Sequence, residues 1–209
     1  MNLPRPGKIV CIGRNYVAHA RELGNQLPDR PLLFLKPPSS LISSGEAIRL
    51  PPDSARVEHE AEIALVIGRR CRNISEADAL SVVAGYAPLN DVTARDLQRL
   101  DVQFTRAKGY DTFCPVGPVV PAHGRDWRDL VVTCRVNGEE RQRARADEMV
   151  FGVPALIAYI TRVMTLEPGD LIATGTPAGV GPIGPGDTVE VSLEGLSAVV
   201  NEVIAEPHS

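Results

Sequence analysis

Short apolar runs, separated by turns rich in glycine and proline, make up most of the chain. Residues 57–67 are the clearest of them and predict a buried strand that ends at Gly68. Shorter runs predict further strands at residues 8–12, 32–35, 86–90, 171–173, 188–193 and 198–203. Residues 131–136 and 139–143, joined by Asn137-Gly138, predict a hairpin with a type I′ turn.

Four short helices are expected, at residues 17–23, 75–84, 94–100 and 154–165. Ser75 and Thr93 suit the N-cap positions of the second and third, because their hydroxyls accept hydrogen bonds from free backbone N–H groups. Pro154 suits the first turn of the fourth. Helices lie early and in the middle while strands dominate the end, which is an α+β pattern without regular βαβ alternation. We expect one domain, residues 1–209, on which residues 1–50 form at most a small N-terminal lobe.

Composition and charge exclude several classes of protein. The 209 residues are 44% apolar with a formal net charge of −4, which excludes intrinsic disorder and disfavours nucleic acid as a partner. The longest charge-free run, residues 171–186, carries five glycines and three prolines, so no membrane span is expected. The N-terminus lacks the apolar stretch of a signal peptide, so we expect a cytoplasmic location. The four cysteines include no CxxC pair and are expected to be buried free thiols.

Carboxylates gather at the start of the clearest strand. Glu60 and Glu62 share one face of a strand, and Glu58 extends the row. Such neighbours repel one another unless a cation neutralises them, and their oxygens suit Mg²⁺, Mn²⁺ or Ca²⁺. A solvent-facing strand edge is the alternative. The apolar run that follows favours burial, and buried carboxylates need a partner.

Two further groups carry polar side chains at useful spacings. Asp91 sits where a buried strand meets a helix, and Arg95 and Gln98 share a helical face that could grip a carboxylate or keto oxygen. His19 and Glu22 are one helical turn apart, so that the carboxylate could orient the imidazole as a general base. Solvated surface residues are the alternative for both groups.

Two segments near glycines complete the candidates. Only Lys8, Lys36 and Lys108 among the 22 basic residues are lysines. Lys108 precedes a glycine and could reach an active site as a point charge, although a surface position is the alternative. Residues 173–181, around Thr176, are small enough for backbone amides to approach a ligand. The GxGxxG match at residues 179–184 is not a dinucleotide site, because its prolines forbid the required helix.

In this order, these stretches resemble the fumarylacetoacetate hydrolase family, most of all its short bacterial and mitochondrial acylpyruvate hydrolases. The resemblance spans residues 8–204 and rests on six stretches: Gly13-Arg14-Asn15-Tyr16 with His19 and Glu22, Leu33 to Pro37, His59 to Glu62, Asp91 to Gln98, Ala107-Lys108 and Thr174 to Pro182. It implies a mixed β-roll or sandwich-like fold with short helices, a homodimer, and a divalent metal, Mg²⁺ or Mn²⁺.

The resemblance also implies roles for single residues. By position these are metal ligands (Glu60, Glu62 and Asp91), a water-activating pair (His19 and Glu22), an active-site lysine (Lys108) and substrate contacts (Arg95, Gln98 and Thr176). Two features depart from the family pattern. Glu58 stands where many members have a neutral residue or histidine, and residues 99–107 form a shorter segment than in close relatives.

The activity implied by the resemblance is metal-dependent hydrolysis of a carbon–carbon bond in an acylpyruvate-type β-diketo acid, through a metal-bound pyruvate enolate. The substrate would be a small 2-oxo acid. Oxaloacetate decarboxylation and isomerisation of a 2-hydroxyhepta-2,4-diene-1,7-dioate share the same electronic step and are close alternatives. A metal-stabilised binding protein without catalysis, or a structural protein with a solubilising acidic strand, are alternatives of a different class.

Overall fold

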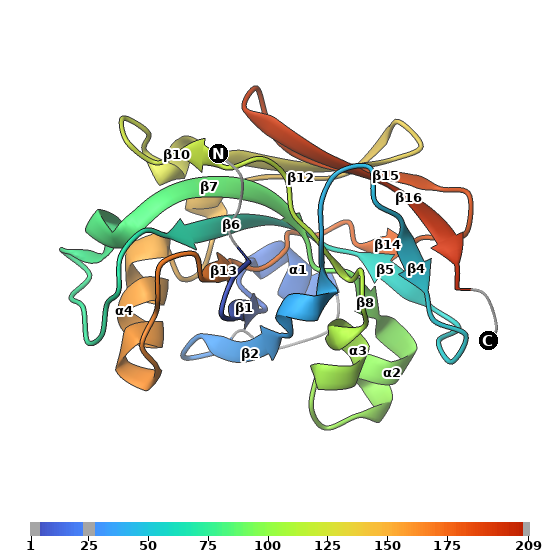
Figure 1. Ribbon diagram of the computed structural model, residues 1–209, viewed down its shortest axis with the longest axis horizontal. Coiled ribbons are helices and arrows are strands. Elements are labelled where there is room, and N and C mark those ends of the chain that lie inside the picture. Colours follow the sequence, from blue (N-terminus) through green and yellow to red (C-terminus); the bar gives the residue numbers. More distant parts are fainter. Residues whose placement is uncertain (1–4, 23–27, 207–209) are drawn as a thin grey trace.

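A six-stranded sheet and a five-stranded sheet pack against each other in the computed structural model, which describes residues 5–22 and 28–206 (Figure 1). The six-stranded sheet consists, in spatial order, of β10 (Val120–Pro121), β7 (Val83–Asn90), β6 (Ala61–Ile67), β13 (Leu171–Ala173), β1 (Ile9–Gly13) and β2 (Leu32–Lys36). The five-stranded sheet consists of β12 (Glu139–Arg145), β11 (Val131–Val136), β15 (Thr188–Leu193), β16 (Ser197–Ala205) and β4 (Ile48–Leu50). Strands from the first 50 residues therefore belong to both sheets.

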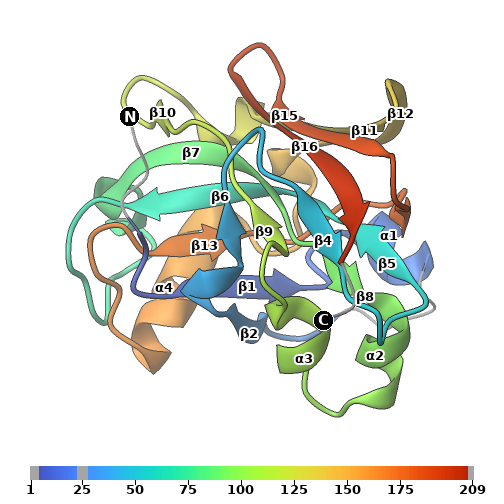
Figure 2. The same ribbon diagram turned by 45° about the vertical axis from the view of Figure 1, so that its right-hand side comes forward.

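Smaller elements surround the two sheets. Short pairings join β14 (Gly181–Pro182), β5 (Val57–His59) and β8 (Thr93–Ala94), and β3 (Leu41–Ile42) with β9 (Cys114–Pro115). The α-helices of the described residues are α1 (Val17–Glu22), α2 (Arg95–Leu100), α3 (Thr105–Gly109) and α4 (Val153–Val163). The 3-10 helices are η1 (Pro38–Ser40), η2 (Ala79–Val82), η3 (Trp127–Asp129) and η4 (Ala146–Glu148). In both ribbon views α2 and α3 lie at the opposite end from α4 (Figures 1 and 2). None of the described helices has the length and apolar character needed to cross a bilayer.

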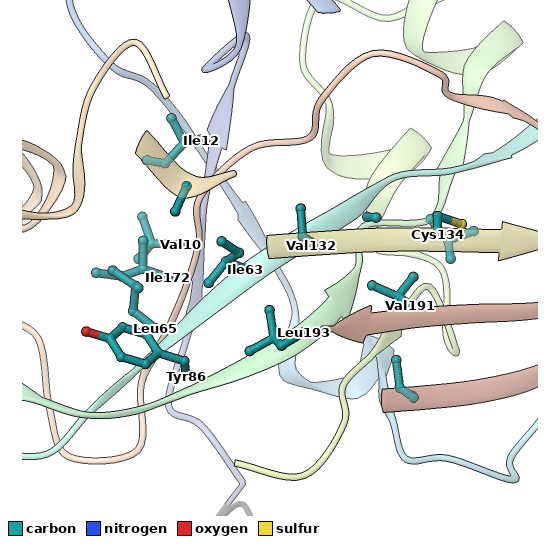
Figure 3. Close-up of a cluster of buried hydrophobic side chains, with 14 of the residues drawn as sticks. Val10, Ile12, Ile63, Leu65, Tyr86, Val132, Cys134, Ile172, Val191 and Leu193 are labelled. Carbon is teal, nitrogen blue, oxygen red and sulfur yellow. The ribbon is translucent and has the colours of Figure 1, made fainter. Parts of the chain in front are cut away.

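The main core lies between the two sheets. Ile63 and Leu65 of β6 belong to the same apolar cluster as Val132 of β11 and Leu193 of β15 (Figure 3). The alternate residues of β6, such as Ala64, belong to a second apolar cluster on the other face of the sheet. A strand covered on both faces needs no polar alternation, which explains the continuous apolar run that predicted β6.

The structure confirms the predicted class of mixed sheets with short helices, and most predicted elements are present. The turn at Asn137 and Gly138 has φ values of 54° and 83°, as a type I′ hairpin requires. Helix α1 ends at Glu22, and Leu23 of the predicted helix lies outside the described residues. The predicted strand at residues 57–67 is interrupted at Glu60, whose backbone N–H donates to the Asn90 side chain.

Two sequence predictions were wrong. Residues 75–84 do not form one α-helix: a turn at Ser75 leads into the short 3-10 helix η2, and β7 begins at Val83. The ladder that pairs β7 with β6 starts at Val83 opposite Ile67, and it ends the helical segment there. Thr93 does not cap α2 either. It lies in β8 opposite Glu58, and its hydroxyl donates to the Asp91 carbonyl.

Candidate active site

Three carboxylates converge where two neighbouring strands meet. Glu60 directly precedes β6, and Asp91 directly follows β7. The strands are antiparallel with Ala61 opposite Asn90, so the start of one lies beside the end of the other. One oxygen each from Glu60, Glu62 and Asp91 lies within 4.8 Å of the others, and all three residues are at most 4% exposed. The resemblance stated above implied that these carboxylates, from two separate segments, converge.

Two lysines hold Asp91 in place. Lys108 of α3 donates to Asp91 Oδ2 at 2.7 Å and to Glu60 Oε2 at 2.8 Å. Lys36, at the end of β2, donates to Asp91 Oδ1 at 2.7 Å and to the Val92 carbonyl at 3.2 Å. Both lysines are almost fully buried. Each oxygen of Asp91 therefore accepts a hydrogen bond from a different ammonium group.

Arg95 forms hydrogen bonds with both Glu58 and Glu60. Its Nε donates to Glu58 Oε2 at 2.7 Å, its Nη2 donates to Glu60, and its Nη1 donates to Gln98. Burial alone would raise the pKa of Glu58, but Arg95 and Arg56 outweigh it and lower that pKa. Glu58 therefore acts as an anchor for Arg95.

The pKa values of Glu60 and Glu62 are shifted in opposite directions. Burial favours the protonated form of Glu60, yet Lys108 and Arg95 outweigh it and hold its pKa far below the ordinary value. Burial raises the pKa of Glu62, and the charges of Asp91 and Glu60 raise it further. Among the described residues the hydrogen bond to Glu62 comes from the Gly175 backbone at 2.7 Å, not from a cation. Glu62 is thus the carboxylate in this cluster whose charge is not compensated.

The donor set fits a hard divalent cation. Glu58, Glu60 and Asp91 are each paired with at least one of Lys36, Arg56, Arg95 and Lys108. Glu62 has no such cationic partner among the described residues, so a cation bound beside it would supply the missing counter-charge. Carboxylate oxygens are the ligands that Mg²⁺ and Mn²⁺ prefer.

A candidate general base stands near the carboxylates. His19 of α1 is 5% exposed, and its Nδ1 lies 3.3 Å from Glu22 Oε2. Glu22 is held in turn by the Gly179 backbone N–H at 3.0 Å. Gly179 has φ of +98°, and a Cβ there would lie 2.1 Å from the Arg141 carbonyl, so only glycine fits. The small residues of this loop therefore let its amides approach the carboxylates of the site.

These side chains open onto one pocket of about 240 Å³. Its lining includes most of the residues expected from the sequence: His19, Glu60, Glu62, Arg95, Gln98, Lys108 and Thr176. Asp91 and Glu22 are not in the lining; Asp91 is hydrogen-bonded to the two lysines, and Glu22 to His19. Phe34 and Phe104, stacked edge to face at 5.6 Å, form an apolar wall.

Thr176 is more constrained than the sequence indicated. Its hydroxyl donates to the Ala61 carbonyl at 2.9 Å and accepts from Gln142 Nε2 at 2.8 Å. Gln142 Oε1 also accepts from the Ala61 backbone N–H at 3.0 Å and lies 2.9 Å from His59 Nδ1. Gln142 and Thr176 thus clamp Ala61, the residue between the two central glutamates.

Sequence reasoning missed Lys36 and Gln142 as site residues. Lys36 carried a signal, because it is one of three lysines and ends an apolar strand. Gln142 carried one too, since it alternates with Arg141 and Arg143, which are both exposed in β12. A polar residue on the inward face of a strand must find buried partners.

Comparison with known proteins identifies the family. The family model described as "Fumarylacetoacetate (FAA) hydrolase C-terminal" matches residues 8–204 of the chain. The chain belongs to the fumarylacetoacetate hydrolase family. Within that family it is 46% identical to a mitochondrial oxaloacetate tautomerase of Arabidopsis thaliana, over 94% of this chain and 90% of the relative. It is 44% identical to a mitochondrial oxaloacetate decarboxylase of Dictyostelium discoideum, over 90% and 89% of the two chains.

Solved structures of the family have the same fold. A 2-hydroxyhepta-2,4-diene-1,7-dioate isomerase of Mycobacterium marinum superposes with a TM-score of 0.89 and 45% identity, over 98% of this chain and 77% of that one. A fumarylpyruvate hydrolase of Pseudomonas aeruginosa, in complex with Mn²⁺ and pyruvate, has a TM-score of 0.87 and 32% identity, over 95% and 90%. The family's named members thus include tautomerases, decarboxylases, isomerases and hydrolases.

Proposed function

We propose that this fumarylacetoacetate hydrolase family member is a divalent-metal-dependent enzyme that hydrolyses a carbon–carbon bond of an acylpyruvate-type β-diketo acid. One observation carries the proposal: His19, backed by Glu22, lines the same pocket as Glu60 and Glu62. Addition of water needs a base beside the electrophilic centre, whereas a protein that only bound a metal would need none.

The metal would be held by Glu60, Glu62 and Asp91, with Mg²⁺ or Mn²⁺ as the expected ion. When bound, it would draw electron density from the keto oxygen of a 2-oxo acid and so stabilise the negative charge that bond cleavage leaves on the adjacent carbon. Lys108 would add positive charge beside the metal ligands, because its Nζ donates to both Glu60 and Asp91.

The chain's own groups would carry the proton transfers. A carboxylate only accepts hydrogen bonds, so Glu22 favours the imidazole tautomer with its proton on Nδ1 and leaves Nε2 free to take a proton from water. The water oxygen bonds to the distal carbonyl carbon, and the bond from that carbon to the methylene breaks. The electron pair stays on the methylene carbon, which takes back the proton held by His19. Arg95 and Gln98 would position the substrate carboxylate.

Replacing His19 by alanine is expected to lower kcat for acylpyruvate hydrolysis by about 10²–10⁴-fold, the usual contribution of a general base. Metal affinity should stay unchanged, because His19 is not in the carboxylate cluster. Isothermal titration with Mg²⁺ and steady-state assays with acetylpyruvate and fumarylpyruvate measure the two effects. The exposed His123→Ala variant is the control and should match the wild type. Full hydrolysis by the His19→Ala variant would defeat the proposal.

Added Mg²⁺ is expected to raise Tm relative to EDTA, by about 5–10 °C at 100 times its Kd. The rise should grow with pH. The pKa of Glu62 is raised above its ordinary value of 4.5. In EDTA, its protonated form therefore contributes stability at pH below 4.5, and that contribution is lost as pH rises toward the raised value. A bound cation competes with that proton and reverses the loss. A Tm series from pH 5 to pH 8, with and without metal, tests this, and equal melting curves would favour a purely structural acidic strand.

Oxaloacetate chemistry is the second candidate, and a specific observation favours it. The relatives named for oxaloacetate are 46% and 44% identical to this chain, against 32% for the fumarylpyruvate hydrolase. Loss of CO₂ from oxaloacetate needs no base, whereas hydrolysis and keto–enol interconversion both need a proton acceptor. If His19→Ala retained oxaloacetate decarboxylation while the wild type left acylpyruvates intact, the decarboxylase would replace the hydrolase.

A further inference from the structure

Two arginines of the pocket have no acidic partner within the described part of the chain. Arg95 and Lys108 already donate hydrogen bonds to Glu58, Glu60 and Asp91, as described above. Arg14 and Arg99 also line the pocket. Within residues 5–22 and 28–206, no ion pair or side-chain hydrogen bond to a carboxylate involves either of them. Their charges are therefore available to a ligand.

Arg14 has an unusual backbone conformation. Its φ is 59°, in the left-handed region that glycine adopts freely and that other residues adopt at a cost. The next residue fixes this conformation. The Asn15 side chain donates to the Thr174 carbonyl at 2.8 Å and accepts from the Phe151 backbone at 2.8 Å. A strained residue that its neighbours hold in place, where glycine would be easier, points to a use for its side chain.

The rest of the pocket indicates what that use is. The carboxylate cluster, Lys108 and Arg95 form a polar region suited to a 2-oxo acid group. Leu32, Phe34 and Phe104 form an apolar wall suited to the carbon chain. A guanidinium group matches a carboxylate in both charge and geometry, because it offers parallel N–H donors.

We propose that Arg14, assisted by Arg99, recognises a second carboxylate on the substrate, so that the pocket prefers dicarboxylic 2-oxo acids to monocarboxylic ones. This inference rests on the proposed function for the placement of the 2-oxo acid group. Arg14 is the principal contact, since its conformation is fixed by Asn15, whereas Arg99 is exposed in the last turn of α2.

Two inert ligands of equal chain length test the inference. 2-Oxoglutarate carries a second carboxylate and 2-oxopentanoate does not, and neither has the β-diketone that hydrolysis would cleave. With Mg²⁺ present, isothermal titration should show that the wild type binds 2-oxoglutarate about 10- to 100-fold more tightly, as expected for one charge-assisted contact. In Arg14→Gln the ratio should fall to about one. Arg99→Gln should lower it less.

Arg14→Gly separates recognition from structure. Glycine adopts a φ of 59° without strain, so this variant should melt no lower than the wild type while losing the preference for 2-oxoglutarate. Arg162→Gln, on the exposed side of α4, removes the same charge outside the pocket and should keep the preference. This variant therefore controls for the effect of the protein's net charge on anion binding.

Outcomes that contradict this inference differ from those that contradict the proposed function. Equal wild-type affinities for the two ligands, no binding of either, or an unchanged ratio in both Arg14 variants would overturn the role of Arg14. A retained preference for 2-oxoglutarate, with no hydrolysis of acetylpyruvate or fumarylpyruvate, would overturn the hydrolase alone.

Discussion

Replacing Glu62 by glutamine is expected to lower metal-dependent activity by about 10³-fold, as loss of a Lewis acid contributing several kcal/mol implies. The same substitution should raise Tm in EDTA. Glu62 is buried beside Asp91 and Glu60, and burial and both charges raise its pKa. A neutral amide removes that repulsion, and its oxygen can still accept the Gly175 hydrogen bond.

Glu60→Gln is the matched comparison, because it removes a carboxylate two residues away. Activity should fall to a similar extent, but the fold should lose about 3 kcal/mol, since Lys108 and Arg95 each lose an ionic partner. Thermal melts in EDTA, Mg²⁺ titration and a standard hydrolysis assay measure the three quantities. If both variants melted lower by the same amount, the charge balance described for the cluster would be wrong.

The opposite signs expected for these two variants could not be predicted from the sequence. The spacing of Glu60 and Glu62 on one strand was enough to predict that they share a face. Their different environments depend on Lys108, which lies 48 residues from Glu60 along the chain. Such long-range pairings decide which carboxylate is compensated, and no local pattern encodes them.

Local patterns succeeded where tertiary contacts agreed with them. The apolar run of β6 and the Asn137-Gly138 turn predicted elements that the sheets reinforce. The Ser75 signal predicted a helix as far as residue 84, yet only a turn and the short 3-10 helix η2 form, and pairing of Val83 with Ile67 of β6 starts β7 before the predicted end. The buried face of β12 shows the same limit: alternation placed Gln142 inward, but only the fold shows that it bonds Thr176.

Replacing Lys36 by methionine is expected to lower the free energy of unfolding by about 3 kcal/mol, equivalent to a fall in Tm of about 10 °C. Lys36 is 1% exposed, and its ammonium group is the partner of Asp91 Oδ1. Methionine fills a similar volume, so the loss reports the unpaired buried charge more than a cavity. Chemical denaturation of the wild type and the variant measures it.

Lys8→Met is the matched control. Lys8 also pairs with a buried aspartate, Asp170, but its side chain is 25% exposed. Asp170 keeps hydrogen bonds from the backbone N–H groups of Lys8 and Glu167 at 3.1 and 2.8 Å. The loss should therefore stay within about 1 kcal/mol, as for exposed ion pairs. Equal losses of unfolding free energy in both variants would show that burial of the ammonium group does not determine the size of the loss.

The response of Lys36→Met to Mg²⁺ separates two roles for the lysine. Lys36 and Lys108 bind different oxygens of Asp91, and only Lys108 also contacts Glu60. Lys36 should therefore be a permanent counter-charge, and the variant should melt lower than the wild type both in EDTA and in saturating Mg²⁺. If Mg²⁺ instead restored the wild-type Tm, the metal could replace the ammonium group, and Asp91 would not need two cations at once.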